Sequence, residues 1–164
     1  MKRNILFIVL ISIYISVGAQ QKTTEMFYTG TMTSEGAEGI YLCSFDSSTG
    51  DISQLQVFKG VDNPNYLNTS PKGKFLYVVS RPPNPIDPDG GSLLAYRITA
   101  DGALEFLNKQ SSHGDDPCYV EVSADGKFVA VANYGGGSVA LFPVREDGSL
   151  EPAGSVIRPT GTSE

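Results

Sequence analysis

The fold of this chain is decided by residues 117–150, whose sequence is PCYVEVSADGKFVAVANYGGGSVALFPVREDGSL. Short apolar runs in this stretch alternate with Asp-Gly and Gly-rich turn signals, a pattern that predicts three β-strands. Residues 64–104 carry the same marks in the same order. Pro64, Ser70 and Gly73-Lys74-Phe75 each lie 53 positions before their counterparts, Pro117, Ser123 and Gly126-Lys127-Phe128. The chain is therefore built on an internal repeat.

The spacing of the repeat predicts the architecture. Later in the repeat, Gly91-Ser92 matches Gly137-Ser138 at 46 positions, because residues 81–90, RPPNPIDPDG, hold a seven-residue insertion. A strand-rich repeat of about 45–50 residues is typical of a blade of a β-propeller. We therefore predict an all-β fold, a β-propeller of four-stranded antiparallel blades, of which this chain contains two to three.

Eleven strands are expected from the apolar runs and turns, and no helical spacing of apolar residues persists over ten positions. The expected strands are 26–31, 40–45, 52–59, 66–69, 75–80, 93–98, 104–110, 119–123, 128–133, 139–144 and 155–157. They form a partial first blade at 26–60 that lacks its inner strand, a second at 63–111 and a third at 116–158. Because propellers have at least about four blades, we expect the chain to be the N-terminal part of a longer protein, with a self-assembling fragment as the alternative.

The N-terminal residues have the features of a secretory signal. Lys2 and Arg3 precede an apolar run at residues 5–17, and Val17-Gly18-Ala19 supplies small residues for cleavage. We expect residues 1–19 to be removed and the mature chain, residues 26–164 of which form the fold, to be exported to the periplasm or the exterior. A retained anchor is the alternative, but the run is short for a bilayer, so no stable membrane insertion is expected after cleavage.

Charge and cysteine content restrict the partners. The net charge of −6 argues against nucleic acid, which requires clustered Lys and Arg. One histidine and no CxxC motif predict no metal site and no cofactor. Cys43 and Cys118 lie in different repeats, and we expect buried free thiols, with a disulfide as the alternative that export would permit.

The candidate binding residues lie in two sets of loops at one end of the predicted blades. His113, with Asp115 and Asp116 beside it, could perform acid–base chemistry, or the segment could be a solvated turn capped by an Asp. Arg81, at the start of the insertion, could pair with a carboxylate or phosphate, or lie free on the surface.

The segment around Asn133, Tyr134 and Gly135 is the second candidate. Its glycines would let the backbone approach a ligand, and the two side chains offer donors and acceptors. The alternative is a flexible turn. No helix follows the glycines, so this is not a phosphate loop. Neither a nucleophile elbow nor a Ser/His/Asp arrangement is found, and no catalytic residue is assigned.

The chain resembles the lactonase family of seven-bladed β-propellers, which includes 6-phosphogluconolactonases and carboxymuconate lactonising enzymes. The resemblance extends from about residue 26 to 160. It is carried by Tyr28-Thr29-Gly30-Thr31, Gly39-Ile40-Tyr41, residues 70–78 (SPKGKFLYV), and above all residues 116–119 (DPCY) with 131–139 (VANYGGGSV).

The resemblance implies hydrolysis of a sugar lactone without a required metal. The family's acid–base and anion-binding His, Arg and Glu residues lie in blades beyond the third, so none is carried over to this chain. A signal sequence is unusual for an enzyme of a cytosolic phosphorylated sugar, so a non-phosphorylated lactone is an equal expectation. The alternative function is a non-enzymatic exported scaffold that binds protein or glycan.

Overall fold

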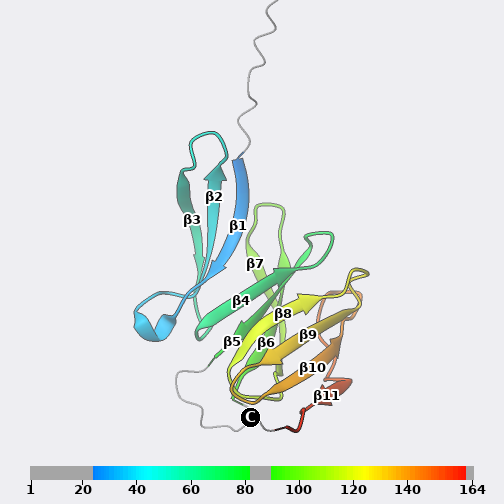
Figure 1. Ribbon diagram of the computed structural model, residues 1–164. Helices are drawn as coiled ribbons and strands as arrows, with labels where there is room; N and C mark the ends of the chain where they lie inside the picture. The colour runs from blue at the N-terminus through cyan, green and yellow to red at the C-terminus, as the bar shows by residue number, and fades with distance from the viewer. Residues whose placement is uncertain (1–23, 82–89, 162–164) are drawn as a thin grey trace, which may run out of the picture.

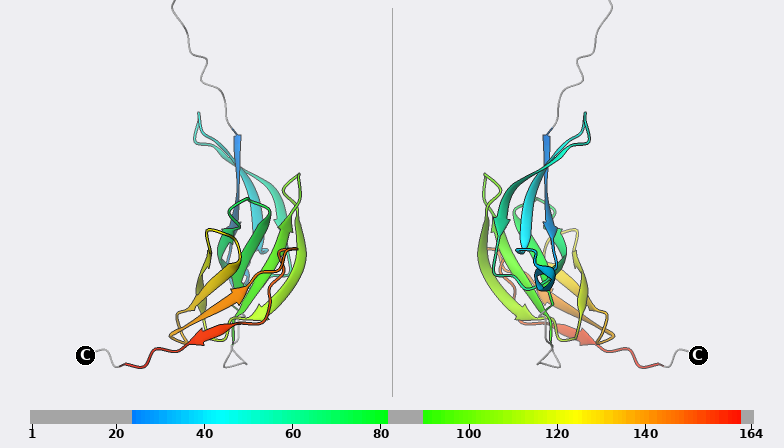
Figure 2. Two further views of the ribbon diagram at one scale, coloured as in Figure 1. Left: turned by 90° about the vertical axis from the view of Figure 1, so that its right-hand side faces the viewer. Right: turned by 90° about the vertical axis from the view of Figure 1, so that its left-hand side faces the viewer.

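The computed structural model describes residues 24–81 and 90–161, which form three antiparallel sheets (Figure 1). The first sheet has three strands in the order β1-β2-β3, and the other two have four each, β4-β5-β6-β7 and β8-β9-β10-β11. Figures 1 and 2 show the three sheets side by side, with β4–β7 between the other two. This is the arrangement of consecutive propeller blades, and it confirms the predicted fold class.

The strands follow the sequence repeat. Their bounds are β1 Thr24–Gly30, β2 Ile40–Asp46, β3 Ile52–Phe58, β4 Pro64–Thr69, β5 Phe75–Ser80, β6 Ser92–Ile98, β7 Leu104–Ser111, β8 Pro117–Val122, β9 Phe128–Asn133, β10 Ser138–Pro143 and β11 Ser155–Ile157. All eleven agree with the predicted ranges to within two residues. The described residues also contain one short 3-10 turn, η1 (Thr33–Glu35), between β1 and β2.

Irregularities in the ladders recur at the same positions in neighbouring sheets. The register shifts between Pro64 and Tyr66 in β4 and between Pro117 and Tyr119 in β8. A proline has no N–H to donate to the ladder, so each inner strand starts with a bulge.

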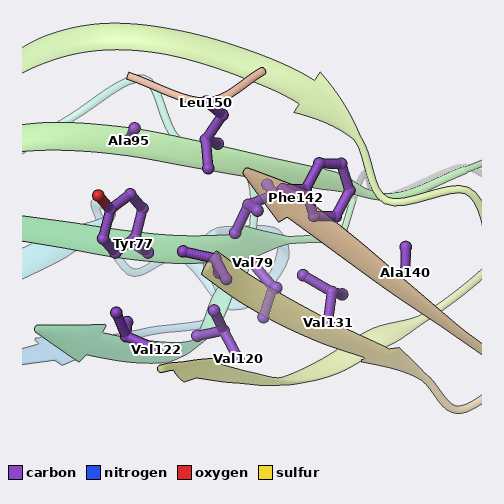
Figure 3. Packing of buried hydrophobic residues seen from close by; sticks show 11 residues of the cluster. Tyr77, Val79, Ala95, Val120, Val122, Val131, Ala140, Phe142 and Leu150 are labelled. Atoms are coloured by element: carbon purple, nitrogen blue, oxygen red, sulfur yellow. The ribbon is translucent and has the colours of Figure 1, made fainter. Parts of the chain in front are cut away.

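The core lies between the sheets. Residues 76–79 of β5 (Leu76, Tyr77, Val78 and Val79) are almost completely buried, because β5 is covered on both faces. Tyr77 and Val79 pack with the third sheet, where Val120 and Phe142 are also buried (Figure 3). Leu76 and Val78 pack toward the first sheet, so the nearly continuous apolar run in the sequence is explained. Burial of each such side chain contributes about 1.5–3 kcal/mol.

Two predictions fall outside the described residues. The signal sequence proposed for residues 1–19 and most of the insertion, residues 82–89, are among the residues that the structure does not describe. The division into a removed signal and three blades with the limits given above therefore stays a prediction. In the described residues, no helix is long and apolar enough to cross a membrane.

Candidate functional site

One end of the sheets carries the loops in which four of the five candidate residues lie, and Asn133 is the last residue of β9, which leads into one of these loops. These loops connect β1 to β2, β3 to β4, β5 to β6, β7 to β8 and β9 to β10. The β7–β8 and β9–β10 loops bind each other directly: Tyr134 donates its N–H to the carbonyl of Asp116 at 2.8 Å, and Gly136 donates to that of Asp115 at 3.1 Å. The two loops therefore form one unit.

The residue before each inner-strand proline has an unusual backbone. Asn63 precedes Pro64 with φ of 40°, and Asp116 precedes Pro117 with φ of 54°. Asn and Asp tolerate this left-handed region better than most residues, yet the conformation is costly. In both repeats the carbonyl of this residue accepts the N–H of the residue that follows the second strand, Arg81 in one case and Tyr134 in the other. The strained positions thus recur at the same place in each blade.

Arg81 pairs with Asp116 of the next blade. Its Nε lies 2.6 Å from Asp116 Oδ1, and the side chains are 41% and 23% exposed. The N–H is not well aligned with this oxygen, which has no hydrogen bond of good geometry, so the contact is primarily electrostatic. Arg81 is therefore paired with a carboxylate of the protein itself, and its role in binding a ligand stays a prediction. The contact runs through Nε, so the two terminal nitrogens of the guanidinium are not the atoms of this pair.

Asn133 lies inside the loop unit rather than on its surface. Its side chain is only 3% exposed, and Nδ2 donates to the carbonyl of Ser112 at 2.9 Å and to Ser138 Oγ at 3.0 Å. Its Oδ1 is buried and has no partner among the described residues. The Asn133 amide, at the end of β9, therefore joins the two loops through hydrogen bonds, and its predicted contact with a ligand stays a prediction.

Tyr134 and Gly135 are on the outer surface of the unit. The Tyr134 side chain is 80% exposed, so its ring and hydroxyl are open to solvent. A Cβ on Gly135 would lie 3.0 Å from Asp115 Oδ2 and 3.1 Å from Asp116 Cβ. The glycine therefore permits close approach between two loops of the protein, whereas the sequence alone suggested approach to a ligand.

The ring of His113 packs against β10, and within residues 24–81 and 90–161 it makes no hydrogen bond or ion pair with Asp115 or Asp116. Its ring stacks on Phe142 with centroids 6.3 Å apart, and its carbonyl accepts from Ser138 Oγ and from Arg158 Nη2 at 3.3 and 2.9 Å. Its backbone is left-handed, with φ of 56°. The placement resembles the turn alternative more than an acid–base pair with Asp115 or Asp116, since no bond to either is found among the described residues.

The structure adds residues that the sequence argument did not select. Asp116 was noted as a neighbour of His113 and as part of the DPCY motif, but not as a contact of Arg81 and Tyr134, both of which it touches. On the inner strands, Tyr66 and Tyr119 have partly exposed rings in contact with each other. The 53-residue repeat could have found both, because it aligns Asn63 with Asp116 and Tyr66 with Tyr119.

The cysteines are free thiols in separate sheets. Cys43 in β2 is buried, whereas Cys118 in β8 is only partly buried, with Sγ 3.8 Å from the carbonyl of Ala132. The prediction of two buried residues was thus wrong for Cys118, which lies at the register shift between Pro117 and Tyr119, where the regular ladder with β9 is interrupted. Within the described ranges, no three His, Cys, Asp or Glu residues are grouped as a metal site would require.

Comparisons with known proteins agree on one family. The model of the lactonase family, seven-bladed β-propeller, matches residues 26–164. The 6-phosphogluconolactonase of Bacillus subtilis is 38% identical over 140 residues, which cover 85% of this chain and 39% of that protein. The 6-phosphogluconolactonase of Formosa agariphila is 30% identical over 76% of this chain and 35% of its own length.

Solved structures give the same result. A protein of Bacteroides fragilis, named as a proposed 6-phosphogluconolactonase, superposes with a TM-score of 0.76 at 36% identity and covers 90% of this chain and 39% of its own. The periplasmic gluconolactonase of Pseudomonas aeruginosa has a TM-score of 0.72 at 34% identity, over 82% of this chain and 39% of its own. The chain thus spans about two fifths of the length of these relatives, and it belongs to the lactonase family of seven-bladed β-propellers.

Proposed function

We propose that this chain is part of a hydrolase that opens a sugar lactone with water. Two of the curated relatives are named 6-phosphogluconolactonase, and a structural neighbour is named periplasmic gluconolactonase. In the reaction, water adds to the lactone carbonyl, the bond from the carbonyl carbon to the ring oxygen breaks, and the ring oxygen takes up a proton. The products are a free hydroxyl and a carboxylate. No electron is transferred, so no redox cofactor is proposed.

The loop unit provides binding groups for such a substrate. The observation that carries the proposal is the orientation of Arg81, whose Nε is held by Asp116. The terminal nitrogens can then donate to an anionic oxygen, either a phosphate on the substrate or the carboxylate of the product. Tyr134, with its exposed hydroxyl, can bind a sugar hydroxyl beside it. Asn133, Gly135 and His113 contribute by holding the loops in place.

The cell compartment and the substrate are proposed together. A signal sequence at residues 1–19 would export the protein from the cytoplasm. Phosphorylated sugar lactones are scarce outside the cytoplasm. We therefore propose a non-phosphorylated aldonolactone as the first substrate to test. The gluconolactonase of Pseudomonas aeruginosa, named as periplasmic, supports this choice.

The test is an assay of lactone opening by acid release. The 164-residue chain and the complete product of its reading frame are each supplied with D-glucono-1,5-lactone and with its 6-phosphate. We expect turnover by the complete product and none by residues 1–164 alone, because the chain contains no assigned catalytic residue. Turnover of neither lactone by the complete product, with retained binding of a glycan or protein, would instead favour the scaffold function.

A further inference from the structure

The inner strands β4 and β8 present matching side chains along one wall. Tyr66 and Asn68 of β4 correspond through the 53-residue repeat to Tyr119 and Glu121 of β8. Successive residues of a strand point to opposite sides, so each pair lies on one side of its strand. Tyr119 lies two residues beyond Pro117, so the wall begins roughly 7 Å from the loop unit. It is therefore continuous with the candidate site.

Side-chain amides hold the two inner strands together. Asn65 Nδ2 donates to the carbonyl of Pro117 at 2.9 Å, and Asn68 Nδ2 donates to that of Val120 at 3.3 Å. The strands belong to different sheets, and no ladder pairs them. These amides therefore fix the spacing between the two sets of side chains.

The part of the wall nearer to the loop unit, formed by Tyr66 and Tyr119, is aromatic. The rings of Tyr66 and Tyr119 have centroids 4.8 Å apart and are inclined at 50°. They are 38% and 42% exposed, so the two rings cover each other only in part. Because they are inclined, each ring leaves apolar surface on which the C–H groups of a sugar can pack.

The part of the wall farther from the loop unit, formed by Asn68 and Glu121, is polar. Glu121 Oε2 accepts the hydroxyl of Tyr119 at 2.7 Å and the amide of Asn68 at 3.3 Å. The hydrogen bond to Glu121 raises the pKa of Tyr119, so this hydroxyl keeps its proton to higher pH than a free tyrosine does. Glu121 Oε1 has no hydrogen bond within residues 24–81 and 90–161, so it remains an open acceptor for a sugar hydroxyl.

We propose that Tyr66, Tyr119, Asn68 and Glu121 form a binding wall for a neutral sugar ring. The rings take the C–H face of the sugar, and Glu121 accepts its hydroxyls. A carboxylate in the polar part disfavours an anionic ligand, so the wall selects an uncharged ring over its ring-opened sugar acid. The inference goes beyond the proposed reaction, because it concerns a ring that binds whether or not it is hydrolysed.

The test uses the 164-residue chain with ¹³C-labelled tyrosine rings. The probe is 1,5-anhydro-D-glucitol, a neutral pyranose that has no lactone bond, and D-gluconate is the anionic comparison. We expect saturable shifts of the Tyr66 and Tyr119 signals with the neutral probe and weaker binding of gluconate. Failure of lactone hydrolysis would leave this result unaffected, so the two proposals are tested separately.

Variants separate the contributions of the aromatic part and the polar part of the wall to binding. Tyr66→Ala and Tyr119→Ala should each weaken binding of the neutral probe about two- to tenfold. Glu121→Gln should reduce the difference in affinity between the neutral probe and gluconate. Tyr119→Phe keeps the ring, releases Glu121 and should retain most of the binding. Phe128→Ala, at a comparably exposed aromatic residue of β9, is the control and should bind as the parent chain does.

Two results would overturn the proposal. One is the absence of shifts at either ring while the amide spectrum shows a folded chain. The other is equal loss of binding in the Phe128 control and in the Tyr variants, which would indicate a general effect on folding.

Discussion

Arg81 Nε lies 2.6 Å from Asp116 Oδ1, and this contact joins the loop after β5 to the loop that precedes β8. The same Asp116 accepts the N–H of Tyr134 through its carbonyl at 2.8 Å. One residue, in a left-handed conformation, therefore connects the loops of two neighbouring blades. Its side chain positions the cation, and its backbone positions the tyrosine.

Replacing Asp116 should lower the stability of the chain more when the new residue disfavours a left-handed backbone than when only the charge is removed. Asp116→Asn removes the ion pair but tolerates φ of 54°, so we expect a loss of at most about 1 kcal/mol in the free energy of unfolding. Asp116→Ala also places an unsuited residue in the left-handed region and should cost about 1–2 kcal/mol more. Urea unfolding of both variants measures the difference, and equal losses would contradict it.

Arg81 should influence substrate binding rather than the chemical step. In the active protein, Arg81→Ala removes the cation and should raise KM for an anionic lactone about tenfold, with little change in kcat. Arg81→Lys keeps the charge but lacks the planar guanidinium whose Nε contacts Asp116. We therefore expect a KM between those of the parent protein and of Arg81→Ala. A matched neutral lactone is the control. An equal effect on both substrates would show that Arg81 does not bind the anionic group.

Gly114 should not tolerate a side chain. A Cβ there would lie 2.3 Å from Ser138 Oγ and 2.6 Å from Asn133 Nδ2, both part of a buried hydrogen-bond network. Gly114→Ala should therefore destabilise the chain by about 1–3 kcal/mol. Gly161→Ala is the control, since no atom lies within 4 Å of its Cβ position. Similar urea midpoints for the two variants would show that the loops can separate freely.

Asn133 should contribute to stability through its buried amide. Asn133→Ala removes donors to the carbonyl of Ser112 and to Ser138 Oγ, which we expect to cost about 1–3 kcal/mol. The exposed amide of Gln56 in β3 provides a matched control, and Gln56→Ala should change stability by no more than about 0.5 kcal/mol. If Asn133→Ala left the stability unchanged, Asn133 would again be a candidate for contact with a ligand.

Alkaline pH should unfold the chain through two buried tyrosines. Burial, aided by Asp147, raises the pKa of Tyr77 to about 12, and burial raises that of Tyr96 to about 12. The folded state thus holds these protons more tightly than the unfolded chain, whose tyrosines have a pKa near 10. Their contribution to stability is complete below pH 10 and is lost as the pH rises from 10 to 12.

The measurement for this prediction is circular dichroism across that pH range. Tyr77→Phe with Tyr96→Phe removes both ionisable hydroxyls and should move alkaline unfolding to higher pH. The loss of the bond from the Tyr77 hydroxyl to the carbonyl of Gly148 should lower stability at neutral pH, which serves as an internal check. An unchanged alkaline midpoint would contradict the assignment to these two side chains.

Much of the fold was predictable from the sequence, because strands and turns depend on local patterns. The apolar run at residues 75–80 and its repeat at 128–133 marked β5 and β9 with the observed bounds. The side-chain partners could not be read in this way. Asn133 and His113 were selected by residue type, yet their side chains contact Ser138 and Phe142 of β10, which the residue types alone do not reveal.

The sequence by itself determined the blade repeat, the strands and the family, since all three depend on the spacing of apolar, Gly and Pro residues. The tertiary structure decided which polar groups are buried and which are open. Side chains that are 53 positions apart, such as Tyr66 and Tyr119, meet because neighbouring blades pack inner strand beside inner strand. Packing of the loops likewise turned the amide of Asn133 inward, where its buried donors require partners within the protein, and brought the partly exposed charges of Arg81 and Asp116 together.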